Sequence, residues 1–130
     1  MAMRWFNKPK PKEIWDEPIA TPLGDIEAAH IIRDICRAAA DSARSVGRRV
    51  GDRGASNQQE DFQRYERAAR AAMEIAMKIA DDLLRDSAVR QIVDLCFEAD
   101  DLRTARILFR AIQAPSIREE TLRDHPLLGH

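Results

Sequence analysis

Few side chains in this sequence have the types and spacing that catalysis or metal binding requires. Glu27 and His30 have the Glu-x-x-His spacing of di-iron bundles, but such a centre needs two of these motifs and two further carboxylates. Cys36 and Cys96 fall on apolar helix stripes, where buried, inert thiols are expected. The sequence has no nucleophile elbow, phosphate loop or dinucleotide fingerprint. We therefore expect no metal, no cofactor and no catalytic residue.

Arginines near the C-terminus are the first candidate for binding. Arg103, Arg106 and Arg110 stand at i, i+3 and i+7 on a predicted helix, with no acidic residue on that stripe. Like charges at this spacing repel by about a few tenths of a kcal/mol per pair unless an opposite charge compensates them. Three alternatives supply that charge: Asp94 and Glu98 of the preceding helix, an acidic surface of a partner protein, or a nucleic-acid backbone.

A second group of arginines surrounds the glycine-bearing turn in residues 46–54, VGRRVGDRG. It consists of Arg44, Arg48, Arg49 and Arg53. Cations are favourable at a helix C-terminus, but four exceed what one helix dipole needs. Glycines beside them allow a phosphate or an acidic loop to approach closely. This group is the alternative, anion-binding site.

The N-terminal stretch MRWFNKPKPKEIWDEP, residues 3–18, contains both tryptophans of the chain. Lys-Pro-Lys-Pro-Lys forms a stiff spacer after Trp5 and Phe6, so we expect these two aromatic residues to contact a partner protein. Trp15, flanked by Ile14 and Ile19, either docks on the protein's own bundle or joins the partner contact. A membrane surface is a weaker alternative, because two aromatic residues and four cations give only marginal binding.

Long stretches without proline or glycine predict the elements that position these residues. Residues 25–46 and 55–114 contain neither, and alanine is frequent, which favours helix. Asp25 is the predicted N-cap of a first helix that runs to about Val50, on the apolar stripe Ile26, Ala29, Ile32, Cys36, Ala39, Ala43, Val46 and Val50. A second helix is predicted from Ser56 or Asn57 to about Arg85, on the stripe Phe62, Tyr65, Ala69, Ala72, Ala76, Ile79 and Leu83.

Three shorter helices are predicted after the second one. Ser87 caps a short third helix, and Asp100 or Asp101 caps a fourth that ends at Pro115. Ser116 and Glu119 then form a capping box for one or two final turns. The predicted fold is an all-α bundle, a long antiparallel helix hairpin plus a shorter helical hairpin. Residues 1–22 are expected to be an extended Pro-rich segment, and residues 23–130 a single domain.

Composition limits the function classes. The chain has 130 residues and a formal net charge of −1, so no overall field draws it to nucleic acid or membrane. No apolar run resembles a signal peptide or a membrane helix, and we expect a cytoplasmic protein. The predicted function is a non-enzymatic protein-interaction module that is an adaptor, an assembly factor, or a regulator or inhibitor of a larger machine. A nucleic-acid-associated factor is the runner-up and an enzyme ranks third. The alanine-rich seam between the two long helices either lies within one chain or is shared between the two chains of a homodimer.

Overall fold

The computed structural model describes residues 13–16, 23–48 and 55–129 of the chain. Within these ranges every regular element is helical and no strand occurs, so the predicted all-α fold is confirmed. The elements are η2 (Ile14–Asp16), α1 (Asp25–Arg48), α2 (Ala55–Ala76), α3 (Asp82–Glu98), α4 (Leu102–Phe109), α5 (Pro115–Asp124) and η3 (Pro126–Gly129), where η denotes a 3-10 helix.

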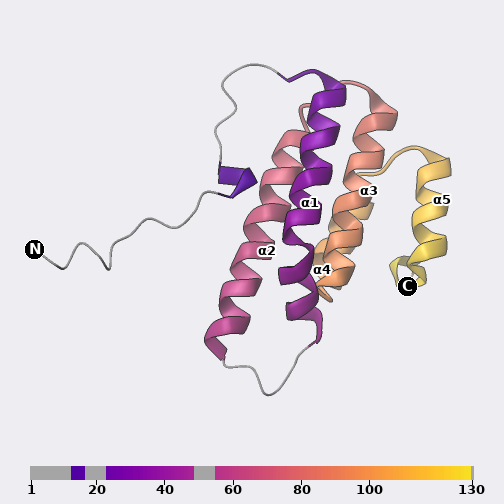
Figure 1. Ribbon diagram of the computed structural model, residues 1–130. Coiled ribbons are helices and arrows are strands. Elements are labelled where there is room, and N and C mark those ends of the chain that lie inside the picture. Colours follow the sequence, from indigo (N-terminus) through magenta and orange to yellow (C-terminus); the bar gives the residue numbers. More distant parts are fainter. Residues whose placement is uncertain (1–12, 17–22, 49–54, 130) are drawn as a thin grey trace, which may run out of the picture.

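The helices form one bundle, in which α1 packs against both α2 and α3 (Figure 1). α1 and α2 make the long antiparallel hairpin. α4 folds back along α3 to make the shorter hairpin, and α5 lies against the outer side of α3 (Figure 1). The two predicted hairpins are therefore present, although α3 is longer than the sequence suggested.

α1 buries a broader face than its predicted stripe. Ile32, Ala39 and Ala43 are buried as expected, but Ile26 is 65% exposed. Because α1 packs against α2 on one side and α3 on the other, its buried face also includes residues beside the stripe: Ala28, Ile35, Ser42 and Ser45. Gly24, rather than Asp25, precedes the first turn, since its carbonyl accepts the N–H of Ala28.

The predicted long second helix is interrupted, and this part of the prediction is wrong. α2 ends at Ala76, and α3 begins at Asp82. The side chain of Asp81 accepts a hydrogen bond from the N–H of Leu84 and so caps α3, whereas the predicted cap Ser87 lies inside this helix. The interruption leaves Leu83, the last residue of the predicted stripe, 60% exposed.

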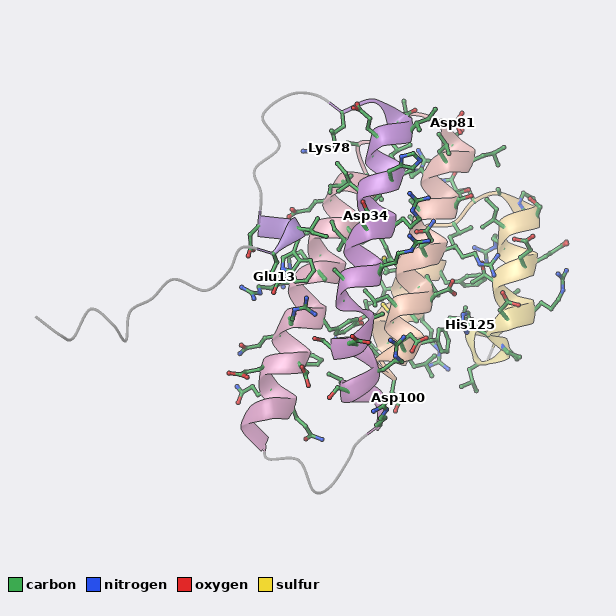
Figure 2. All side chains as sticks on the ribbon, in the orientation of Figure 1. Glu13, Asp34, Lys78, Asp81, Asp100 and His125 are labelled. Carbon is green, nitrogen blue, oxygen red and sulfur yellow. The ribbon has the colours of Figure 1, made fainter. Side chains whose placement is uncertain are left out.

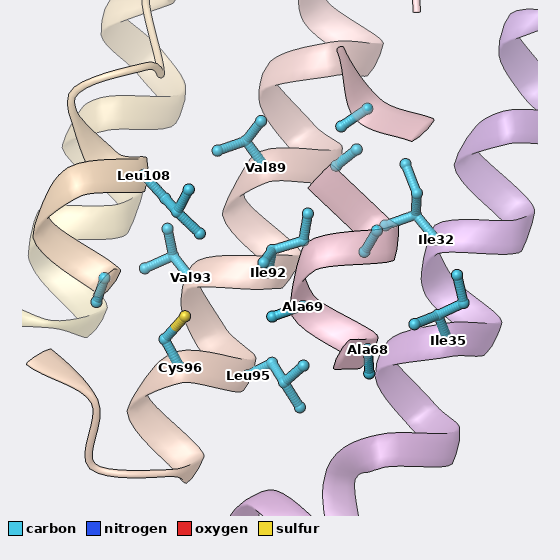
Figure 3. Close-up of a cluster of buried hydrophobic side chains, with 14 of the residues drawn as sticks. Ile32, Ile35, Ala68, Ala69, Val89, Ile92, Val93, Leu95, Cys96 and Leu108 are labelled. Carbon is cyan, nitrogen blue, oxygen red and sulfur yellow. The ribbon is translucent and has the colours of Figure 1, made fainter. Parts of the chain in front are cut away.

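The core brings together side chains of the first four helices (Figure 3). Isoleucines of α1 face alanines of α2 and a mixed row of α3 side chains, and Leu108 reaches them from α4 (Figure 3). Small residues such as Ala68, Ala72 and Ala76 are buried and let α2 approach its neighbours closely. The predicted alanine-rich seam is therefore internal to one chain.

Tyr65 links this core to the start of α4. Its ring is buried, and its hydroxyl donates a hydrogen bond of 2.7 Å to one oxygen of the Asp101 carboxylate. The other oxygen accepts the N–H of Thr104 at 3.2 Å, which makes Asp101 the N-cap of α4. Asp101 was one of the two predicted caps, and through Tyr65 it fixes the direction in which α4 leaves the core.

A buried carboxylate fixes the start of α5. Asp86 of α3 is 1% exposed and accepts hydrogen bonds from the N–H groups of Gln113 and Ala114, at 3.1 and 2.8 Å. Pro115 is the first residue of α5, and the predicted Ser116 capping box is absent because the N-cap is Ala114. None of the helices in the described ranges combines the length and the apolar stretch that a membrane crossing needs.

Candidate functional site

The outward face of α4 gathers three arginines around an apolar side chain. Ala105, Leu108 and Phe109 bury the opposite face of this helix. The outward positions are Arg103, Arg106, Ile107 and the C-cap residue Arg110, at i, i+3, i+4 and i+7. Arg103 and Arg110 are exposed, and Ile107 between them is 54% exposed. These arginines therefore lie on one face of α4, as their spacing predicted.

Arg106 extends this face toward the C-terminal 3-10 helix. Its Nη2 atom donates a long hydrogen bond of 3.5 Å to the carbonyl oxygen of Leu127 in η3. Its Nε atom is buried and has no hydrogen-bond partner among the described residues. Leu127 is itself 55% exposed, so a second apolar side chain borders the arginines. We call Arg103, Arg106, Ile107, Arg110 and Leu127 the α4 face.

The acidic residues that were candidates to neutralise these arginines are engaged elsewhere. Asp94 lies 2.7 Å from the Nε2 atom of His125, and Glu98 lies 3.8 Å from Arg44. In the described part of the chain, no carboxylate pairs with any of the three arginines of the α4 face. The interpretation that Asp94 and Glu98 neutralise these arginines within the chain is therefore wrong, and the α4 face keeps its positive charge.

The alternative, anion-binding arginines are only partly within the described residues. Arg49 and Arg53 lie outside them. Arg44 forms an ion pair of 2.6 Å with Asp41 and a longer one with Glu98. Arg48 lines a cleft of about 640 Å³ between the ends of α1 and α3 and the C-terminal segment, together with Arg44, Gly47, Asp94, Phe97, Glu98, Asp124 and His125. Three carboxylates in this lining oppose the binding of a phosphate.

Sequence reasoning missed the pair formed by His125 and Asp94 in this cleft. The His125 ring stacks on Phe97 with 3.9 Å between ring centroids and 6° between planes. Figure 2 labels His125 beside α5, at the side of the bundle opposite Glu13. No spacing rule could link Asp94 to His125, because 31 residues separate them.

A carboxylate beside an imidazole can orient a general base. The described residues that line this cleft, however, include no serine, threonine or cysteine to act as nucleophile. Arg90 also pairs with Glu120 and Asp124, so these polar contacts together hold α5 and His125 against α3.

Cys96 is buried, as its stripe position predicted, whereas Cys36 is only partly buried against the core. Burial raises the pKa of Cys36 to about 12, and it raises the pKa of Cys96 to about 12 as well. Both thiols are free. Burial likewise raises the pKa of the Tyr65 hydroxyl, with Cys96 and Asp101 nearby. Thiols that stay protonated at neutral pH are poor nucleophiles and poor metal ligands.

The aromatic candidates divide between described and undescribed residues. Trp5 and Phe6 lie outside the described ranges. Trp15 in η2 is half-buried against the bundle's own core, and the guanidinium of Arg64 lies 5.0 Å from its ring centroid. Trp15 thus contacts its own chain, which was one of its two predicted alternatives.

The fold and the site define a small all-α bundle with a basic face that has an apolar centre. Compared with known protein families, with curated proteins and with solved structures, the chain has no match.

Proposed function

We propose that this protein is a non-enzymatic protein-interaction module, an adaptor, assembly factor or regulator, that binds an acidic surface of a partner protein through the α4 face. One observation carries the proposal: three arginines surround the exposed Ile107, and no carboxylate in the described ranges pairs with them. The cytoplasm is the compartment we propose for it, because both cysteines are free and free thiols persist where the environment is reducing.

The α4 face divides affinity and selectivity between its two kinds of side chain. Covering Ile107 and Leu127 contributes about 25 cal/mol per Å² of apolar surface removed from water. Exposed ion pairs contribute only about 0.2–1 kcal/mol each, but they reject partners that carry like charge and they accelerate encounter. A partner with an apolar side chain bordered by carboxylates fits both requirements. On sequence grounds alone, Trp5 and Phe6 supply a second part of this contact.

Nucleic-acid binding remains the runner-up. Its candidate residues within the described ranges are Arg44 and Arg48, and Arg44 already pairs with Asp41 and Glu98. A site that binds the phosphate backbone needs cations that are free to replace counterions, and its affinity falls steeply with salt. An enzyme is the third alternative.

Affinity capture with charge-reversed variants tests the proposal. The intact chain and the variant Arg103→Glu/Arg110→Glu are immobilised and exposed to extract of the native cell treated with nuclease, at about 0.3 M salt. We expect the intact chain to retain specific proteins that the variant loses, because reversed charges repel an acidic surface. A shortened chain without residues 1–12 tests the contribution of Trp5 and Phe6 in parallel.

Arg67→Glu/Arg70→Glu on α2 is the matched control. Both residues are exposed arginines of the same bundle, one turn apart, so the control changes the net charge equally. If the control and the α4 variant lose the same proteins, general charge and not the α4 face governs capture. Tight binding of a labelled DNA or RNA duplex that only Arg44→Glu/Arg48→Glu abolishes would replace the proposal with its runner-up.

A further inference from the structure

Arg64 of α2 holds the short segment formed by Glu13 and η2 against the bundle. Its Nε and Nη2 atoms donate hydrogen bonds of 3.1 and 3.0 Å to the two oxygens of Glu13. Its Nη1 atom donates to the carbonyl oxygen of Ala38 and to the hydroxyl of Ser42 in α1, both at 2.9 Å. The guanidinium is therefore fixed in the seam between α1 and α2 with its fork directed at a carboxylate.

Trp15 completes this contact two residues after Glu13. Its ring lies over the same guanidinium at 5.0 Å and packs against the edge of the core. Figure 2 labels Glu13 beside α2, where η2 lies against the bundle. One arginine thus recognises two features of a short segment, a carboxylate and an aromatic face. We call Arg64, Ala38 and Ser42, with the surface under the Trp15 ring, the Arg64 seat.

The segment that occupies the Arg64 seat is only partly buried: the side chain of Glu13 is 30% exposed, and Trp15 is half-buried. None of the three residues of η2 is buried, and Ile14 is 43% exposed. The Nε1 atom of Trp15 is covered but has no hydrogen-bond partner among the described residues. An element with few buried contacts opens at a lower free energy than the whole bundle. We therefore expect the segment to leave the Arg64 seat at a lower free energy than the helices unfold.

We propose that the Arg64 seat is a binding site for a short segment in which glutamate is followed two residues later by tryptophan. Glu13 and Trp15 fill it within the chain, and a Glu-x-Trp segment of a partner protein enters when η2 leaves. The occupant now in the seat defines the chemistry it accepts: a carboxylate for the guanidinium fork and an aromatic ring for its face. This site is separate from the α4 face and does not depend on it.

Peptide binding to the full-length chain tests this site. The probe is an end-blocked, labelled peptide of residues 11–18, PKEIWDEP, and its binding is measured by fluorescence anisotropy. The variant Glu13→Ala/Trp15→Ala empties the seat but leaves the buried core unchanged. We expect this variant to bind the peptide at least about tenfold more tightly than the intact chain, whose own segment competes.

Three controls separate this site from adventitious peptide binding. A peptide with alanine at the tryptophan position should lose about tenfold in affinity, and so should the emptied variant with Arg64→Lys, which keeps the charge but loses the fork. Arg67→Lys at the exposed position beside it should change nothing. Circular dichroism of each variant tests whether its helices are intact.

Two results would overturn the proposal. The first is failure of the emptied variant to bind the peptide at about 1 mM, the weakest affinity that a specific site of this size should have. The second is equal binding by the emptied variant and its Arg64→Lys form. Capture of the same proteins by the intact chain and by the α4 variant would contradict the proposed function but would leave both peptide-binding expectations unchanged, so the two proposals fail independently.

Discussion

The side chain of Asp25 accepts a hydrogen bond of 2.8 Å from the backbone N–H of Asp81, although 56 residues separate them. The other carboxylate oxygen of Asp25 accepts the N–H of Ala80 at 3.1 Å. These amides precede the first turn of α3, where a negative charge is favourable. The start of α1 therefore ends the preceding helical stretch and orients α3 without any glycine or proline.

Removal of the Asp25 carboxylate should destabilise the bundle. Asp25→Ala leaves two backbone N–H groups without their acceptor, and we expect the free energy of unfolding to fall by about 1–2 kcal/mol. Asp25→Asn keeps one acceptor oxygen and should lose about half as much. Urea unfolding followed by circular dichroism measures both changes.

Glu74→Ala on α2 is the control for the Asp25 variants. Glu74 is exposed, and its replacement should change the free energy of unfolding by less than about 0.5 kcal/mol. Equal stability of Asp25→Ala and Glu74→Ala would show that the two hydrogen bonds do not stabilise the bundle.

Gly47 lets the end of α1 pass close to the backbone of α3 at Glu98. A Cβ atom at this position would lie 2.2 Å from the backbone oxygen of Glu98, which cannot move independently of its helix. Gly47→Ala should therefore destabilise the protein by about 1–3 kcal/mol, even though alanine favours helix. Because Gly47 lines the cleft, we also expect changed NMR chemical shifts at Phe97 and His125.

Gly129→Ala provides the comparison for Gly47→Ala. Its added Cβ would meet only a Leu122 methyl group at 3.7 Å, an ordinary contact. We expect its unfolding free energy to stay within about 0.5 kcal/mol of the wild-type value. A Gly47→Ala protein as stable as Gly129→Ala would mean that the last turn of α1 moves away from α3 without cost.

The raised pKa values of the two thiols predict a loss of stability in alkali. The pKa values of Cys36 and Cys96 are about 12 in the folded protein, against an ordinary value of 9.0. The unfolded chain therefore loses these protons first as the pH rises above about 9, and deprotonation favours unfolding. Below that pH, we expect the thiols' contribution to the free energy of unfolding to be constant. Above it, the free energy of unfolding should fall by up to about 1.4 kcal/mol per pH unit for each thiol.

Urea unfolding at about pH 8 and about pH 10 measures this effect. The double variant Cys36→Ala/Cys96→Ala should lose less stability between the two pH values than the wild type does. Since Tyr65 has an ordinary pKa of 10.0 that burial raises, part of the alkaline loss should persist in the variant. Fast alkylation of Cys96 in the folded protein at about pH 8 would contradict its burial.

The sequence by itself determined where the chain is helical and much of what each helix buries. Frequent alanine and the absence of proline and glycine predicted helix throughout 25–46 and through most of 55–114. Alanine loses no side-chain entropy in a helix, whereas glycine and proline disfavour one. Apolar spacing identified Ile32 and Ala72 as core residues, and charge spacing placed three arginines on one face of α4.

Only the tertiary structure decided where the helices break and which charges meet. Aspartates, and not glycine or proline, mark both breaks between helices. Hydrogen bonds of Asp25 and Asp81 separate α2 from α3. Asp100, with a φ of 56°, precedes Asp101, which is the N-cap of α4. The pairing of Asp94 with His125 and of Glu13 with Arg64 joins residues 31 and 51 positions apart. No local pattern encodes such contacts, since a side chain's partner depends on how whole helices pack.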